Sequence, residues 1–160
     1  EYIKDFTEKA NQEGFPMFMG YEWQGAGKDG DHNVFFLENK ENTYFPMRYE
    51  ELEKHFRDKN CIAIPHHLAY QLGHRGKNWE THNDKFSPFV EIYSSHGSSE
   101  NDESQIGMDR HVHMGPRTGA TAVEKGWEKG HQFGVIASGD NHSVLHKLFY
   151  LQKKLFGMLS

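Results

Sequence analysis

The chain has only one cysteine, Cys61, among its 160 residues. A single thiol excludes an internal disulfide and a cysteine-rich zinc site. Because Cys61 is followed by Ile62, Ala63 and Ile64, we interpret it as a small core residue and not as a nucleophile.

No apolar run reaches the roughly 18 residues that a transmembrane helix requires, and the N-terminus lacks the layout of a signal peptide. Glu1 is not an initiator methionine, so we expect the chain to begin inside a longer protein.

An excess of positive charge is missing as well. Lys and Arg together number 18 against 23 Asp and Glu, and the formal net charge is -5 at pH 7. This balance gives no electrostatic basis for binding nucleic acid or an anionic membrane surface. We expect a small-molecule partner, and an anionic one would need a local source of positive charge. The 12 Phe, 7 Tyr and 3 Trp argue against disorder, and the length fits one domain.

Histidine is abundant, with 12 residues, which makes metal chemistry the leading hypothesis because neutral imidazole is the commonest metal ligand. The apolar run Val135 to Ala137 predicts a buried strand that is followed by Asp140 and His142. Residues two apart in an extended segment point the same way, so both could reach one cation. The alternative is a loop in which Asp140 makes a turn and His142 lies in solvent.

Two other apolar runs end at similar side chains. The run from residue 15 to 21 is followed by Glu22, which could also cap a neighbouring element. The run 61–64 is followed by Pro65-His66-His67, and since adjacent residues of a regular strand point apart, we expect one histidine to bind and the other to support it. His32 precedes the predicted strand 34–37 and is either a surface residue at the strand edge or a residue aimed beside Glu22.

A fourth predicted strand, 89–93, contains Glu91 and opens into a Ser/Gly-rich loop that carries His96 and Glu100. Small residues let the backbone approach a ligand closely.

Arg117 precedes a predicted helix at 118–130, where terminal amides and a guanidinium could together hold an anion. The loop 70–87 is basic and is either a lid over an anionic substrate or a solvated surface. The pair His111 and His113 follows no apolar strand, and we interpret it as surface.

Helices are expected at 2–13, 49–58 and 118–130, alternating with the strands named above. This order predicts the α/β class with a largely parallel sheet, in which sites lie at the carboxyl ends of strands. The side chains expected at that edge are Glu22, His66, His96, Asp140 and His142.

Five motifs occur in order along residues 15–143: Gly20-Tyr21-Glu22-Trp23, His32-Asn33-Val34, Pro65-His66-His67, the stretch from Val90 to Glu100, and Ser138-Gly139-Asp140-Asn141-His142. This set resembles the PHP (polymerase and histidinol phosphatase) superfamily, most closely a branch named only as a domain of unknown function. The resemblance implies part of a distorted (β/α)7 TIM-like barrel, mostly parallel, with up to three metal ions at strand ends and phosphoester hydrolysis as a frequent activity. The family's first His-x-His motif has no equivalent before Glu22.

The resemblance also implies roles for individual residues. Glu22 matches the bridging glutamate, His32 a further ligand, His66 the histidine of a His-Pro-type motif, and Asp140 with His142 the closing Asp-x-His. Glu91 and His96 match the motif of this branch. The resulting assignments are metal binding by Glu22, His32, His66, Asp140 and His142, proton transfer by His96 or His67, and substrate binding by Glu91, Glu100 and Arg117.

Together these inferences predict a PHP-type metal-dependent hydrolase, a phosphoesterase whose two or three divalent ions activate water. Mixed imidazole and carboxylate ligands suit Zn, Mn or Fe. The alternative is a non-catalytic domain that binds a metal or ligand with an incomplete ligand set. Because of the missing ligands, this chain alone is expected to be inactive. Residues 1–143 are expected to form the partial hydrolase domain and 144–160 a divergent, helical tail. An incomplete barrel would leave apolar faces uncovered, so we expect the chain to be poorly soluble or to associate with itself.

Overall fold

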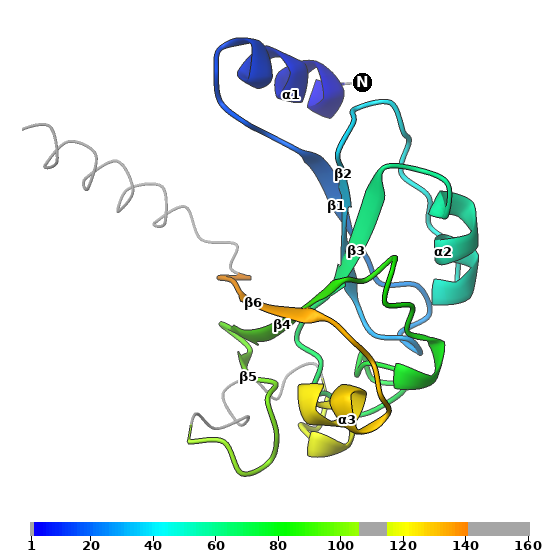
Figure 1. Ribbon diagram of the computed structural model, residues 1–160, viewed down its shortest axis with the longest axis vertical. Coiled ribbons are helices and arrows are strands. Elements are labelled where there is room, and N and C mark those ends of the chain that lie inside the picture. Colours follow the sequence, from blue (N-terminus) through cyan, green and yellow to red (C-terminus); the bar gives the residue numbers. More distant parts are fainter. Residues whose placement is uncertain (1, 106–114, 141–160) are drawn as a thin grey trace, which may run out of the picture.

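The computed structural model describes residues 2–105 and 115–140 (Figure 1). The tail 144–160 predicted to be helical lies outside these residues. Within them, no helix is both long enough and apolar enough to cross a membrane. The elements in chain order are α1 (Tyr2–Gln12), β1 (Met19–Trp23), β2 (His32–Phe36), α2 (Tyr49–Phe56), β3 (Cys61–Pro65), the 3₁₀ turn η1 (Trp79–Thr81), β4 (Phe89–Ser94), β5 (Gly97–Ser98), the 3₁₀ turn η2 (Gly119–Thr121), α3 (Val123–Glu128) and β6 (Gly134–Ala137).

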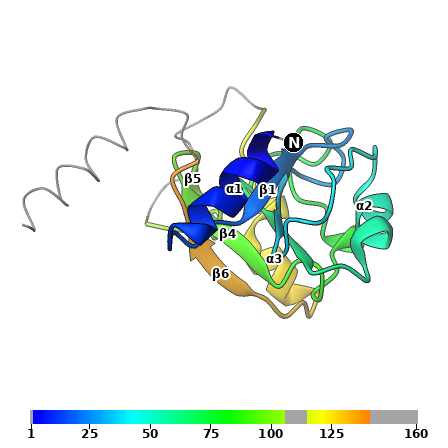
Figure 2. The same cartoon turned by 90° about the horizontal axis from the view of Figure 1, so that it is seen from above.

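The first sheet consists of β1, β2 and β3 in that order, and both pairs are antiparallel. Side chains alternate between the two faces of a strand, so every second residue joins the same core. Trp23, Val34 and Ala63 from the three strands are buried in one cluster with Leu52 and Phe56 of α2. Figure 2 shows α2 and β6 on opposite sides of the molecule. Because the cluster joins all three strands to α2, one face of this sheet is covered by α2 and the other face is directed away from that helix.

The second sheet has β4 in the middle, parallel to β6 and antiparallel to the short β5. Val90 of β4 is buried in a cluster with Leu68, Trp79 and Val123. The backbone N–H of Ala63 in β3 donates to the carbonyl of Phe86, just before β4, at 2.8 Å. This hydrogen bond joins the two sheets along one side of β3.

The expectation of mostly parallel strands in a (β/α)7 barrel is wrong for the described part of the chain. The β1–β2 and β2–β3 pairs are antiparallel, the β4–β6 pair is parallel, and neither sheet closes on itself. A parallel neighbour needs a crossover of about a dozen residues or more, and the Gly-rich loop 24–31 instead lets β2 return directly beside β1. The connection from β2 to β3 contains α2 and is still antiparallel. Alternation of helices and strands thus did not determine strand direction.

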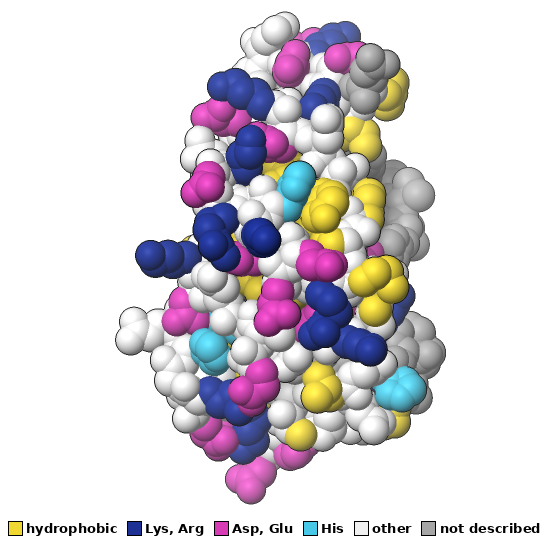
Figure 3. Space-filling view, turned by 90° about the vertical axis from the view of Figure 1, so that its right-hand side faces the viewer, with side chains coloured by type: hydrophobic (Ala, Val, Ile, Leu, Met, Phe, Trp, Pro, Cys, Tyr) yellow, Lys and Arg dark blue, Asp and Glu magenta, His cyan; other side chains and the backbone are white. Residues whose placement is uncertain are grey.

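Acidic and basic side chains are interspersed on the face of the molecule that carries α2, as Figure 3 shows. Elsewhere in the described part of the chain, several large apolar side chains are exposed. They include Phe18 at 58%, Phe35 at 37% and Phe89 at 41% exposure. Exposed aromatic side chains of this kind favour contacts with other molecules. Self-association of the chain stays a prediction.

The strand directions bring several chain ends together. β1 and β3 both run antiparallel to β2, so their carboxyl ends lie at the amino end of β2. The parallel strands β4 and β6 also end side by side, where the N–H of Ser138 donates to the carbonyl of Tyr93 at 3.0 Å. The residues that follow these ends form the candidate site.

Candidate metal centre

The antiparallel register determines which side chains reach the centre. Glu22 pairs with Asn33, so the side chain of Glu22 lies on the face opposite to that of His32. Asp31 precedes His32 by one residue, so its side chain lies on the same face as that of Glu22. The carbonyl of Asp31 accepts the N–H of His66 at 3.1 Å. Glu22, Asp31 and His66 therefore share the sheet face directed away from α2.

His66 is the central side chain of the cluster and is 2% exposed. Its Nε2 lies 3.5 Å from Glu22 Oε1, and its Nδ1 lies 3.2 Å from Asp140 Oδ2. Burial alone would lower the pKa of His66, but the contacts with Asp140 and Glu22 outweigh burial and raise it to about 9. The contact with His66 lowers the pKa of Glu22 to about 2, and the contacts with His66 and His96 lower the pKa of Asp140. Without a bound cation, His66 acts as the counter-ion of both carboxylates.

His67 also points into the cluster, although adjacent residues of a regular strand would point apart. β3 ends at Pro65, and His67 adopts a left-handed backbone conformation with φ of 39°. The ring centroids of His66 and His67 lie 4.0 Å apart, and His67 Nε2 lies 3.6 Å from Asp31 Oδ2. Burial lowers the pKa of His67 to about 2, so this ring is neutral and able to bind a cation. The turn after the strand, invisible in the sequence pattern, brings both histidines together.

Asp31 is the residue that the sequence analysis missed. Its side chain is fully buried, and neither carboxylate oxygen has a hydrogen-bond partner among the described residues. Arg75 Nη1 lies 3.3 Å from Asp31 Oδ2, yet burial outweighs this charge and raises the pKa of Asp31 to about 7. A carboxylate in such surroundings is stabilised by a bound cation. Recognising that β2 and β3 are antiparallel would have placed Asp31 opposite His66.

The side chains present fit a divalent cation. One ligand atom from each of Glu22, Asp31, His66 and His67 lies within 4.8 Å of the others, and the same holds for His66, Glu91 and Asp140. The two groups share His66, so they are adjacent. His66 Nε2 and His67 Nδ1 are buried without a hydrogen-bond partner in the described part of the chain, as are both Asp31 oxygens. Buried polar atoms left unpaired in this way are expected where an ion belongs.

His96 lies beside this cluster, and contacts at both ring nitrogens fix the orientation of its ring. Its Nε2 lies 3.2 Å from Asp140 Oδ2, and its Nδ1 is 2.8 Å from the hydroxyl of Tyr70. The guanidinium of Arg117 lies over the Tyr70 ring, 4.7 Å from the ring centroid, and Nη2 donates to the carbonyl of Ser98 at 2.5 Å. Arg117 thus supports the residue that orients His96. The helix expected directly after Arg117 begins later, at Val123, after the turn η2.

The structure does not bring His32 into the cluster, in contrast to the predicted ligand role. Its ring is buried on the α2 side of the sheet, 4.7 Å from the Tyr49 ring between centroids. Nδ1 donates to the carbonyl of Gly30 at 2.9 Å, and Nε2 then accepts from Lys77 Nζ at 3.4 Å. Both nitrogens are occupied, so His32 has a packing role here.

Two other predicted positions are also separate from the cluster. Glu100 is exposed, and its backbone N–H donates to the hydroxyl of Ser98 at 3.2 Å. It belongs to neither of the two converging groups around His66. The predicted ligand His142 lies outside the described residues, as do His111 and His113.

Glu91 holds the centre together from β4. Its side chain is buried, Oε1 accepts the N–H of His67 at 3.1 Å, and Oε2 accepts the hydroxyl of Ser138. A single carboxylate thereby joins the end of β3 to the end of β6. The two donors reach two different oxygens of Glu91, and a glutamine has an NH₂ group in place of one of them, so it could not accept both hydrogen bonds at these positions.

We expect Glu91→Gln to weaken the binding of Mn²⁺ or Zn²⁺ by about 10–100-fold, as is usual when a residue that orients metal ligands is lost. Competition against a chelating dye measures this change. Glu100→Gln is the matched control because Glu100 is exposed in the same region. Equal affinities in the two variants would show that Glu91 does not support the centre.

Searches for similar proteins found no matching family model, no matching curated protein and no matching solved structure. Functional inference for this chain therefore depends on the geometry of the centre and on the sequence motifs.

Proposed function

We propose that this chain is a metal-dependent hydrolase that acts on phosphoesters. The observation that carries the proposal is the buried Asp31 carboxylate, which has no hydrogen bond from the described residues and converges with Glu22, His66 and His67. Two imidazoles with several carboxylates form a donor set typical of Zn, Mn or Fe. The resemblance of the ordered motifs to the PHP superfamily supports the same class of chemistry.

An anionic substrate needs positive charge near the centre, and Arg75 supplies it. Arg75 contacts Asp31 at 3.3 Å and lines a cavity of about 600 Å³ together with Gln24, Gly27 and His74. Its side chain is 35% exposed, so the guanidinium is accessible from this cavity. Guanidinium groups bind phosphate oxygens well, so a phosphate in the cavity would meet Arg75, whose Nη2 also donates to Gln24 Oε1 at 2.8 Å.

His96 is suited to move a proton beside the centre. Tyr70 holds its Nδ1 and Asp140 lies at its Nε2, so the ring has a defined orientation. Divalent ions in such sites lower the pKa of bound water and stabilise charge on the reacting oxygens. The protein's own contribution is to bind the substrate anion at Arg75, to orient His96 and to bury the carboxylates.

The test measures metal content and hydrolysis on the same preparation. We expect para-nitrophenyl phosphate or its bis-ester to be hydrolysed in the presence of Mn²⁺, Zn²⁺ or Fe²⁺, and turnover to stop on chelation and return when metal is restored. His55→Gln, an exposed histidine away from the centre, should retain full activity. Tight metal binding without turnover of either ester would contradict the proposal and favour a non-catalytic metal-binding domain.

A further inference from the structure

A second group of ligand-type side chains lies apart from the centre. His82 and Asp84 belong to the segment between η1 and β4, and His131 belongs to the segment between α3 and β6. One ligand atom from each of the three lies within 4.8 Å of the others. None of them is shared with the centre around His66. The two segments are distant in the sequence and adjacent in space.

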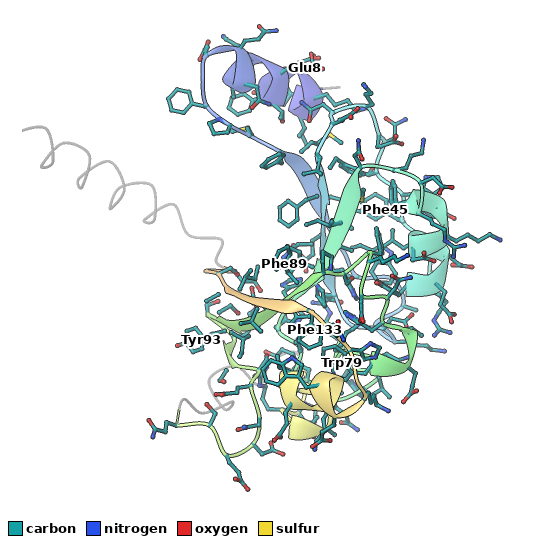
Figure 4. All side chains as sticks on the ribbon, viewed as in Figure 1. Glu8, Phe45, Trp79, Phe89, Tyr93 and Phe133 are labelled. Carbon is teal, nitrogen blue, oxygen red and sulfur yellow. The ribbon has the colours of Figure 1, made fainter. Side chains whose placement is uncertain are left out.

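His82 has a buried ring without polar partners. Its side chain is 0% exposed, and neither ring nitrogen has a hydrogen bond within residues 2–105 and 115–140. The ring packs against Trp79 with centroids 5.1 Å apart and against Phe133 at 5.7 Å. Figure 4 shows Trp79 and Phe133 together near α3. Asp84 Oδ1 lies 3.4 Å from Nε2 without forming a hydrogen bond with it, so this buried imidazole faces a carboxylate while both of its ring nitrogens are unsatisfied.

His131 faces the same carboxylate with a lone pair. Its Nε2 lies 3.0 Å from the carbonyl of Trp79, which accepts only, so the ring hydrogen of a neutral His131 resides on Nε2. Nδ1 then carries a lone pair and lies 3.0 Å from Asp84 Oδ1, which is also an acceptor. Two acceptors at this distance need a proton or a cation between them. The N–H of Gln132 donates to Asp84 Oδ2 at 3.1 Å and keeps Oδ1 directed at both rings.

We propose that His82, Asp84 and His131 bind a second divalent transition-metal ion, for which zinc is the best match. Two imidazoles and one carboxylate leave a fourth position for water, a common arrangement at zinc. The hydrogen bond from His131 Nε2 to a backbone carbonyl is the usual way in which a metal-binding histidine is oriented. Asp84 is 39% exposed, which gives an ion a path from solvent.

Besides its open fourth position, this site links two segments of the fold. It ties the segment before β4 to the segment before β6, and these two strands run in parallel register from Phe89 and Gly134. Glu91 in β4 and Asp140 after the end of β6 belong to the centre. The site is independent of the proposed hydrolase function, because a chain without turnover would still need the strand pair to be aligned.

The test uses Asp84→Asn, because an asparagine amide can donate to a neutral His131 Nδ1 but is a poor zinc ligand. After equilibration with Zn²⁺ and removal of free metal, we expect this variant to hold one ion fewer per chain than the unmodified protein. Substitution by Co²⁺ should give visible absorption bands, one set of which is lost in Asp84→Asn and retained in His66→Ala. The exposed histidine variant His55→Gln should leave both readings unchanged.

Unchanged metal content in Asp84→Asn would overturn the proposal, as would nuclear magnetic resonance spectra of the unmodified protein in Zn²⁺ that show His131 as an imidazolium paired with Asp84. If Asp84→Asn does not fold, His131→Gln serves as the second variant, since its amide can still donate to the Trp79 carbonyl. Loss of one ion in His131→Gln supports the site, and full metal content contradicts it. A chain that loses this ion but keeps metal-dependent turnover separates this proposal from the hydrolase function.

Discussion

Replacing His66 with alanine is expected to lower metal-dependent turnover by more than about 100-fold. His66 belongs to both groups of converging ligand atoms and is the residue that contacts Glu22 at 3.5 Å and Asp140 at 3.2 Å. Loss of residues that only orient metal ligands typically costs about 10–100-fold, so removing the shared ligand should cost more. The measurement is the initial rate of para-nitrophenyl phosphate hydrolysis at saturating metal, together with the metal dissociation constant.

The fold of His66→Ala must be compared with that of the unmodified chain, because His66 is buried. Its neighbour Glu22 is 35% exposed and can be solvated when the imidazole is lost, which favours a folded variant. His55→Ala provides the control, as its ring is exposed and stacks on Tyr44. If turnover and metal affinity are equal in His66→Ala and His55→Ala, His66 is not a member of the centre.

Asp31→Asn is expected to have opposite effects on the metal-free and the metal-loaded protein. The Asp31 side chain is buried without hydrogen bonds from the described residues, so its negative charge destabilises the chain when no cation is bound. Asparagine keeps the shape and removes the charge. We therefore expect the free energy of unfolding to rise in the presence of a chelator, and the stabilisation by added Mn²⁺ or Zn²⁺ to be largely lost.

The pH dependence gives the sign and the size of this effect. Burial raises the pKa of Asp31 from 3.8 to about 7, so the folded metal-free chain holds this proton more tightly than the unfolded chain. The stability contributed by the protonated group is complete below the unfolded pKa and declines as the pH rises from about 4 to about 7. Three pH units correspond to roughly 4 kcal/mol, the largest gain expected for Asp31→Asn at pH 8.

Urea unfolding with a chelator, at pH 8 and at pH 5, measures this difference. The gain should be larger at the higher pH, where the Asp31 carboxyl of the unmodified protein is ionised. Asp58→Asn is the matched control because Asp58 is exposed, and it should change stability little at either pH. If metal-free Asp31→Asn is less stable at pH 8 than the metal-free unmodified protein, the contact with Arg75 already compensates the negative charge of Asp31.

Much of the secondary structure was predictable because it depends on local patterns. The helices at 2–13 and 49–58 and the strands at 61–64 and 89–93 are confirmed, with ends that differ by one or two residues. These segments have either helical spacing of apolar residues or a short continuous apolar run. The predicted helix at 118–130 is less accurate, since the structure has the turn η2 followed by the shorter α3. The run 135–137 forms strand β6, but the expectation that it is buried is wrong, because Val135 is 47% exposed.

Several members of the centre were also predictable from the sequence. Glu22, His66, Asp140 and His96 were all predicted from their positions in or after strands, and the structure brings them together. His32 was predicted by the same reasoning and lies on the opposite face of the sheet. The difference is one residue of register, which reverses the face on which a side chain lies.

The sequence by itself determined which segments become helices and strands and that ligand-type side chains lie at the strand ends. The tertiary structure decided strand direction, and with it which ligand-type side chains converge. Antiparallel pairing of β2 with β3 placed Asp31 beside His66 and directed His32 into the core. The left-handed backbone of His67 brought its side chain into the same cluster. Period and composition are local properties, whereas direction and register depend on which strand becomes the neighbour, and that choice depends on long-range packing.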